Sequence, residues 1–124
     1  MIILTVPEVT EIHEKLIVAT GGFHGISDAR LLESAVLGCY QSFGDTELYP
    51  GIIGKAGRMA YAVCKNHPFF DGNKRAAITS MLIMLRLNDI VPSYTQQELI
   101  DLGLGIADGS IDYSKIVDWL NIHI

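Results

Sequence analysis

The sequence predicts an all-α fold, a compact helical bundle built around one buried central helix. Most of the 124-residue chain carries apolar residues at helical spacing. Two of the predicted helices begin with a threonine followed three residues later by a glutamate, which is the pattern of a capping box. Strand-forming patterns are weak except at residues 42–49, where a short β-hairpin is the alternative to an irregular loop.

The first two helices are delimited by residues with clear capping roles. Thr5 and Glu8 are predicted to start the first helix, and Gly21-Gly22 to stop it. Ser27 is expected to cap the second helix. The apolar face of that second helix is predicted to consist of Leu31, Leu32, Ala35, Val36 and Cys39.

The remaining helices follow from periodicity and breakers. A third helix is predicted over residues 52–66, ending there because Pro68 disfavours helical geometry at the preceding residue. The next, over residues 73–88, is apolar almost all round and is therefore the buried central helix. Thr95, with a glutamate three residues on, starts a helix that runs to residue 107, and the last helix covers residues 113–122.

Composition and charge limit the possible functions. With 49% hydrophobic and 19% charged residues, the chain is expected to form one domain over residues 1–124. It has no apolar run long enough for a bilayer and no secretion signal at its start, so we expect a cytoplasmic protein without a membrane partner. Cys39 and Cys64 are expected to be reduced core residues. The net charge of −5 argues against binding of nucleic acid.

Basic residues nevertheless gather in one part of the chain. That local excess of positive charge suits a small anion, although an ordinary solvated face is the alternative. The basic residues in question are Lys55, Arg58, Lys65, Lys74 and Arg75.

The stretch HPFFDGNKR connects the third helix to the central one. A helix N-terminus presents free N–H groups and partial positive charge, which favours phosphate. Gly72 lets the backbone approach a ligand, and Asn73 could cap the helix. Lys74 and Arg75 carry the wrong sign for the first turn of a helix, which is explained if an anion binds there.

The other half of the stretch supplies candidate catalytic groups. Asp71 is an oxygen ligand placed for Mg²⁺ that bridges phosphates, and His67 is suited to taking a proton from an attacking hydroxyl. Phe69 is expected to anchor the loop in the core. Taken singly, the carboxylate could be a helix cap and the histidine an ordinary residue at a helix end. The clustering of these polar residues and the positive charge at the start of the helix favour a functional site.

The stretch resembles the signature loop of the Fic/Doc family, H-x-F-x-[D/E]-G-N-G-R-x-x-R. Lys74 stands where AMP-transferring members have glycine, and Ile78 where they have a second arginine. The N-K-R variant resembles the death-on-curing (Doc) branch, as do GGFHGISDARLLESAV before the loop and DGS near the C-terminus. The matching residues are His67, Phe69, Asp71, Gly72, Asn73 and Arg75.

This resemblance implies a Fic-like bundle and a toxin that transfers the γ-phosphoryl group of ATP to a protein hydroxyl. The target known for the family is translation elongation factor Tu, and the result is growth arrest. AMP transfer to a protein hydroxyl and a catalytically silent interaction module remain the alternatives. The roles implied are general base for His67, Mg²⁺ ligand for Asp71, and phosphate binding for Gly72, Asn73, Lys74 and Arg75.

The resemblance also implies a substrate flap and a regulator. A flap would hold the target peptide as an added strand, with a plain surface loop as the alternative. The inhibitory pattern [S/T]-x-x-x-E-[G/N] is not found, since SKIVDW at residues 114–119 is a poor match. A separate Phd-type antitoxin is therefore expected. The candidate flap residues are Tyr40, Ser42, Phe43, Thr46 and Leu48.

Overall fold

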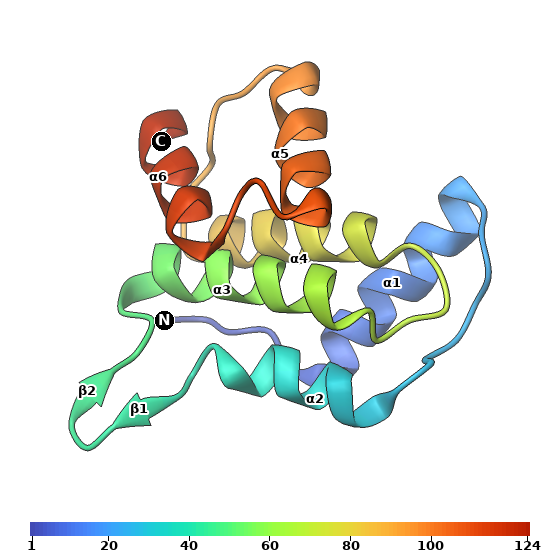
Figure 1. Ribbon diagram of the computed structural model, residues 1–124, viewed down its shortest axis with the longest axis horizontal. Coiled ribbons are helices and arrows are strands. Elements are labelled where there is room, and N and C mark those ends of the chain that lie inside the picture. The colour runs from blue at the N-terminus through green and yellow to red at the C-terminus, as the bar shows by residue number, and fades with distance from the viewer.

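The computed structural model describes residues 1–124 and consists of helices and one small hairpin (Figure 1). The all-α prediction is therefore confirmed, together with the order of the helices. No helix is long and apolar enough to cross a membrane. The helices are α1 (Val6–Thr20), α2 (Ala29–Gly38), α3 (Gly51–Asn66), α4 (Asn73–Leu87), α5 (Gln96–Asp108) and α6 (Tyr113–His123). The antiparallel strands β1 (Ser42–Phe43) and β2 (Thr46–Glu47) lie between α2 and α3.

Two helices, α3 and α4, share the centre of the bundle. They lie side by side, with α2 against one side of α3 and with α5 and α6 on the other (Figure 1). The sequence singled out α4 as the central helix, yet α3 also packs against α2, α5 and α6. Its small residues Ala56, Gly57 and Ala60 allow this close approach, and a Cβ at Gly57 would already touch Ile116 at 3.4 Å.

The helix caps follow the sequence at α1 and α5 but not at α2. Thr5 and Thr95 both form complete capping boxes, as predicted. The predicted cap Ser27 is wrong, because Asp28 caps α2: its Oδ1 accepts hydrogen bonds from the N–H groups of Arg30 and Leu31. The N–H of Ser27 instead donates to the carbonyl of Pro68 at 2.7 Å. The N–H of Asp28 donates to the same carbonyl at 3.1 Å. A carboxylate caps as well as a hydroxyl, and Asp28 is the residue that directly precedes Ala29, the first residue of α2.

Ser80, on the α4 face that packs into the core, is fully buried, and its hydroxyl has no hydrogen-bond partner. An unsatisfied buried hydroxyl costs stability, so we expect Ser80→Ala to raise the free energy of unfolding by about 1 kcal/mol. Chemical denaturation measures this change. A Ser80→Ala variant that is less stable than the wild type would contradict the expectation.

A histidine–glutamate pair ties the end of α6 to the start of α5. His123 Nδ1 lies 2.7 Å from the Trp119 carbonyl and Nε2 lies 2.7 Å from Glu98 Oε2. Both neighbours are acceptors, so this geometry suits the doubly protonated ring. Accordingly, the Glu98 hydrogen bond raises the pKa of His123, and the His123 and Thr95 hydrogen bonds lower the pKa of Glu98 to about 2.

This pair predicts a bell-shaped pH dependence of stability. A raised His123 pKa gives stability that is present below its ordinary value of 6.5 and is lost as pH rises through the folded pKa. A lowered Glu98 pKa gives stability that is present above 4.5 and is lost as pH falls towards about 2. We expect Tm to peak between these limits, and His123→Gln to remove the loss on the alkaline side. An unchanged alkaline limb in the variant would refute the assignment.

Candidate functional site

The α3–α4 loop, residues 67–72, forms the candidate site. As Pro68 predicted, α3 ends at Asn66. The loop is bounded by two residues in the left-handed region, His67 with φ 50° and Gly72 with φ 73°. Positive φ is uncommon for a residue other than glycine, so the surrounding contacts must hold His67 in place.

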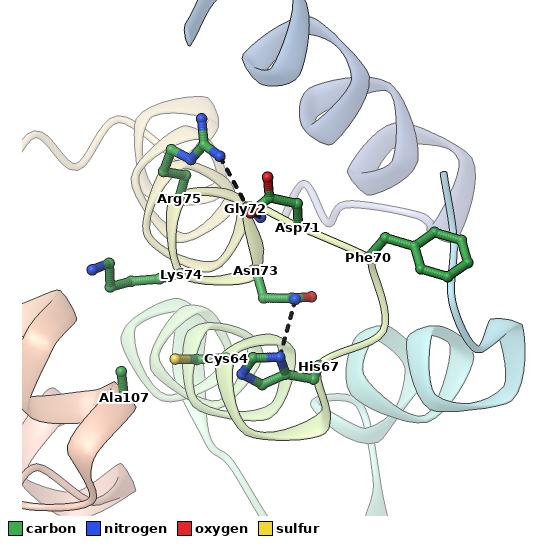
Figure 2. A pocket seen from close by; sticks show the side chains of 9 residues that line it. All are labelled: Cys64, His67, Phe70, Asp71, Gly72, Asn73, Lys74, Arg75 and Ala107. Carbon is green, nitrogen blue, oxygen red and sulfur yellow. Dashed lines mark hydrogen bonds and ion pairs between the residues drawn. The ribbon is translucent and has the colours of Figure 1, made fainter. Parts of the chain in front are cut away.

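Asn73 braces the loop from inside. Its Oδ1 accepts a hydrogen bond from the Phe69 N–H at 2.9 Å, and its Nδ2 donates to the Phe69 carbonyl at 3.0 Å. Nδ2 also lies 3.3 Å from His67 Nδ1 (Figure 2). The predicted capping role is wrong, because Gly72 is the N-cap and no side chain caps α4. The free N–H groups of the first turn therefore remain at the site.

Phe69 anchors the loop in the core, as predicted, but its partner there was not predicted. The ring is 2% exposed and stacks on His13 of α1 with 3.8 Å between centroids. His13 Nε2 also lies 2.7 Å from the Asp71 carbonyl, to which it can only donate. The signal was available, since His13 falls midway between Val9 and Ile17 on the buried stripe of α1.

All six predicted site residues line one cavity of about 360 Å³, which we call the loop cavity (Figure 2). That volume lies within the range of small-molecule sites. Three further lining residues were missed, and one of them comes from α5, far away in the sequence. The predicted residues are His67, Asp71, Gly72, Asn73, Lys74 and Arg75, and the missed ones are Cys64, Phe70 and Ala107.

The Asp71 carboxylate is held by backbone donors. Oδ2 accepts from the Phe23 N–H at 3.1 Å, and Oδ1 accepts from the Gly72 N–H at 2.8 Å. These two bonds, in that order, lower the pKa of the Asp71 carboxyl. The side chain is 40% exposed, and each carboxylate oxygen has more than one lone pair. Asp71 is therefore an ionised, oriented group with free acceptor capacity.

The two basic residues of the first turn behave differently. Arg75 Nη1 donates to the Thr20 hydroxyl and, at 2.8 Å, to the Gly21 carbonyl. Lys74 is exposed, and its side chain points away from Gly72 (Figure 2). The aliphatic stem of Lys74 lies against Gly103, where a Cβ would meet it at 3.3 Å. Both residues also line a second cavity of about 310 Å³ between α1, α4 and α5.

The donor set fits Mg²⁺ only if phosphates complete the coordination. No group of three or more His, Cys, Asp or Glu side chains converges in the structure. Magnesium is usually held through one or two carboxylates together with substrate phosphates and water. Asp71 lies beside the uncapped start of α4, so it can serve as such a carboxylate ligand next to bound phosphates.

The basic cluster seen in the sequence is not one patch. Lys55 is 5% exposed and binds Glu47 Oε2 at 3.1 Å and the Tyr49 carbonyl at 2.8 Å. Arg58 lies over the Tyr49 ring at 4.9 Å. The contacts of these two residues stabilise the fold and lie outside the site. Of the cluster, only Lys74 and Arg75 line the loop cavity.

The predicted hairpin exists, but it lies far from the loop cavity. It precedes α3, whereas the loop follows α3 at its opposite end (Figure 1). A helix of 16 residues spans about 24 Å at its standard rise. Tyr40 donates to the Leu4 carbonyl at 3.0 Å and so belongs to the packed structure, whereas Phe43 is 82% exposed. The positions of Tyr40, Ser42, Phe43, Thr46 and Leu48 therefore do not support a flap that covers His67.

The loop, its cavity and its helical frame place the protein in a known class. The model of the Fic/DOC family matches residues 3–85, and the chain belongs to this family.

Two relatives refine the comparison. The chain is 34% identical over 113 residues to "Protein kinase doc" of Escherichia phage P1, which covers 91% of this chain and 88% of that protein. It is 30% identical over 73 residues to "Toxin Doc" of Mycolicibacterium smegmatis, which covers 59% of this chain and 56% of that protein. The similarity is therefore to the Doc toxins within the family.

Proposed function

We propose that the protein is a Doc-type toxin that transfers the γ-phosphoryl group of ATP to a hydroxyl of a target protein. One observation carries the proposal. A histidine, an ionised carboxylate and two cations converge on one cavity at the uncapped N-terminus of α4. Phosphoryl transfer needs positioning and charge stabilisation, which such an arrangement supplies. The name of the phage relative, a protein kinase, agrees with this chemistry.

Each site residue then has a defined part. The Asn73 amide can only donate to His67 Nδ1, so the neutral ring carries its proton on Nε2. The target hydroxyl replaces that 3.3 Å contact and gives its proton to Nδ1 as its oxygen attacks the γ-phosphorus. The bond between the γ-phosphorus and the oxygen that bridges to the β-phosphate breaks, and ADP leaves. Asp71 would hold Mg²⁺, which neutralises phosphate charge when bound.

The phosphate contacts come from the start of α4. Asn73 contributes its backbone N–H group, since its side chain is occupied by Phe69. The Gly72 N–H is bonded to Asp71 Oδ1, so Gly72 contributes through its lack of a side chain, which lets a phosphate approach the backbone. Lys74 and the remaining guanidinium donors of Arg75 neutralise the polyphosphate.

Transfer of AMP is the second candidate function. The Lys74 side chain points away from Gly72, so the bare backbone that other family members offer to a diphosphate stays open here (Figure 2). One observation argues against AMP transfer. Ile78, which stands where AMP-transferring members have a second arginine, is 9% exposed within the core and supplies no guanidinium.

The proposed setting is the bacterial cytoplasm. Translation elongation factor Tu is the proposed target, and a Phd-type antitoxin is the proposed partner that restrains the enzyme. The relative named a toxin supports this setting. Growth arrest on expression without an antitoxin is its simplest consequence.

Labelled ATP distinguishes the candidates. The purified protein is incubated with Mg²⁺, a bacterial lysate and ATP labelled at the γ- or the α-phosphate, with a His67 variant as the control. Label from the γ position on a discrete protein, lost in the variant, supports the kinase. Label from the α position identifies an AMP transferase. Label from neither position points to an interaction module.

A further inference from the structure

The turn between α1 and α2 contacts both charged groups of the candidate site. We define the α1–α2 turn as Thr20, Gly21, Gly22 and Phe23. The Phe23 N–H donates to Asp71 Oδ2 at 3.1 Å. The Thr20 hydroxyl and the Gly21 carbonyl accept from Arg75. One short segment, about fifty residues earlier in the chain, therefore holds two opposite charges.

Gly22 makes room for the carboxylate. Its φ is +121°, and a Cβ built on it would lie 2.5 Å from Asp71 Oδ2 and 3.0 Å from Arg75 Nη2. The first distance is shorter than real Cβ contacts, so any side chain would displace the carboxylate. Gly44, between the two hairpin strands, also has a positive φ, at +61°, but a Cβ there would meet nothing within 4 Å.

The tethers matter because Asp71 and Arg75 attract each other. Their closest approach, Oδ1 to Nη2, is 3.8 Å, too long for a hydrogen bond. A free arginine and carboxylate form short bidentate pairs that occupy the carboxylate's acceptor positions. The α1–α2 turn satisfies each partner separately, so Asp71 keeps lone pairs available for a cation and Arg75 keeps donors available for an anion.

We propose that the α1–α2 turn is a positioning element that sets the metal-binding geometry of Asp71, and that Gly22 and the Phe23 N–H are its essential parts. The inference rests on the proposed role of Asp71 as a metal ligand. It adds residues outside the signature loop to the site.

Binding of Mn²⁺–ATP, followed by electron paramagnetic resonance, tests the proposal with matched variants. We expect Gly22→Ala to weaken binding about 10- to 100-fold, as loss of outer-shell support typically does. Gly44→Ala also places a side chain at positive φ, but outside the loop cavity and without a steric contact, so its affinity should stay near the wild-type value. Equal weakening in both variants, or no weakening in Gly22→Ala, overturns the proposal.

A second pair tests the hydrogen bond without adding a side chain at Gly22. The Phe23 side chain is 76% exposed, so Phe23→Ala should leave Mn²⁺–ATP affinity unchanged. Phe23→Pro removes the N–H and should weaken binding, while the far-ultraviolet circular dichroism remains that of the wild type. Equal affinities for these two variants would refute the role of the N–H.

Nuclear magnetic resonance separates this proposal from the proposed function. The Phe23 amide should be protected from hydrogen exchange in the wild type and in Gly44→Ala, and should lose protection in Gly22→Ala and in Asp71→Ala. If that pattern holds but Mn²⁺–ATP does not bind the wild type, the proposed function fails and the positioning of Asp71 stands. An unprotected Phe23 amide in the wild type overturns the positioning itself.

Discussion

His67→Asn is expected to lower the rate of phosphoryl transfer by about 10²- to 10⁴-fold, the usual contribution of a general base. His67 lines the loop cavity beside Asp71 and Lys74, and its Nδ1 is paired only with a weak amide donor at 3.3 Å. Asparagine removes the base but adopts the left-handed backbone readily, and the φ of 50° at this position requires that. The measurement is transfer of γ-labelled phosphate to the target protein.

Two observations make this test specific. The unfolding midpoint of His67→Asn should stay close to that of the wild type, because the backbone conformation is preserved. Expression of the variant alone should also no longer arrest growth. Activity near the wild-type level would place the base on another residue and remove the main argument for the proposed mechanism.

Asn73→Ala is expected to destabilise the protein by about 2–4 kcal/mol, because it leaves the buried N–H and carbonyl of Phe69 without partners. Asn73 is 5% exposed, and its two bonds to Phe69, at 2.9 and 3.0 Å, have the usual length of a good hydrogen bond. Urea denaturation measures the loss. Since the loop loses its brace, transfer activity should fall even at temperatures where the variant remains folded.

Asn66→Ala is the matched control for this prediction. Asn66 is also a helix-end asparagine, but its amide makes one partly exposed bond, to the Leu31 carbonyl at 3.1 Å. Its removal should cost no more than about 1 kcal/mol and leave activity unchanged. If both variants lose the same stability, the brace at Phe69 has no special role.

Local signals explain what could be predicted from the sequence. The capping boxes at Thr5 and Thr95 and the end of α3 before Pro68 depend on neighbours within four residues, and all three are confirmed. The signature loop is contiguous, so the sequence alone could assign its six site residues to one place.

Errors occurred where a residue had more than one local possibility. Ser27 and Asp28 can both cap α2, and Asp28 does so, while the Pro68 carbonyl accepts from the N–H groups of both. Asn73 could cap α4, but Phe69 occupies its amide instead. Leu31, predicted on the buried face of α2, is 39% exposed. Serine, aspartate and asparagine side chains offer several local hydrogen-bonding arrangements of similar energy, so sequence alone does not select one.

The helical frame, the family and the chemistry of the loop could all be predicted from the amino-acid sequence, because they rest on short-range patterns. The surroundings of the loop, in contrast, depend on how the helices pack. Packing brings His13 and the α1–α2 turn against Asp71 and adds Ala107 of α5 to the cavity. The reason is physical: these contacts join segments tens of residues apart, and helix lengths and packing angles set them, with no local sequence signal.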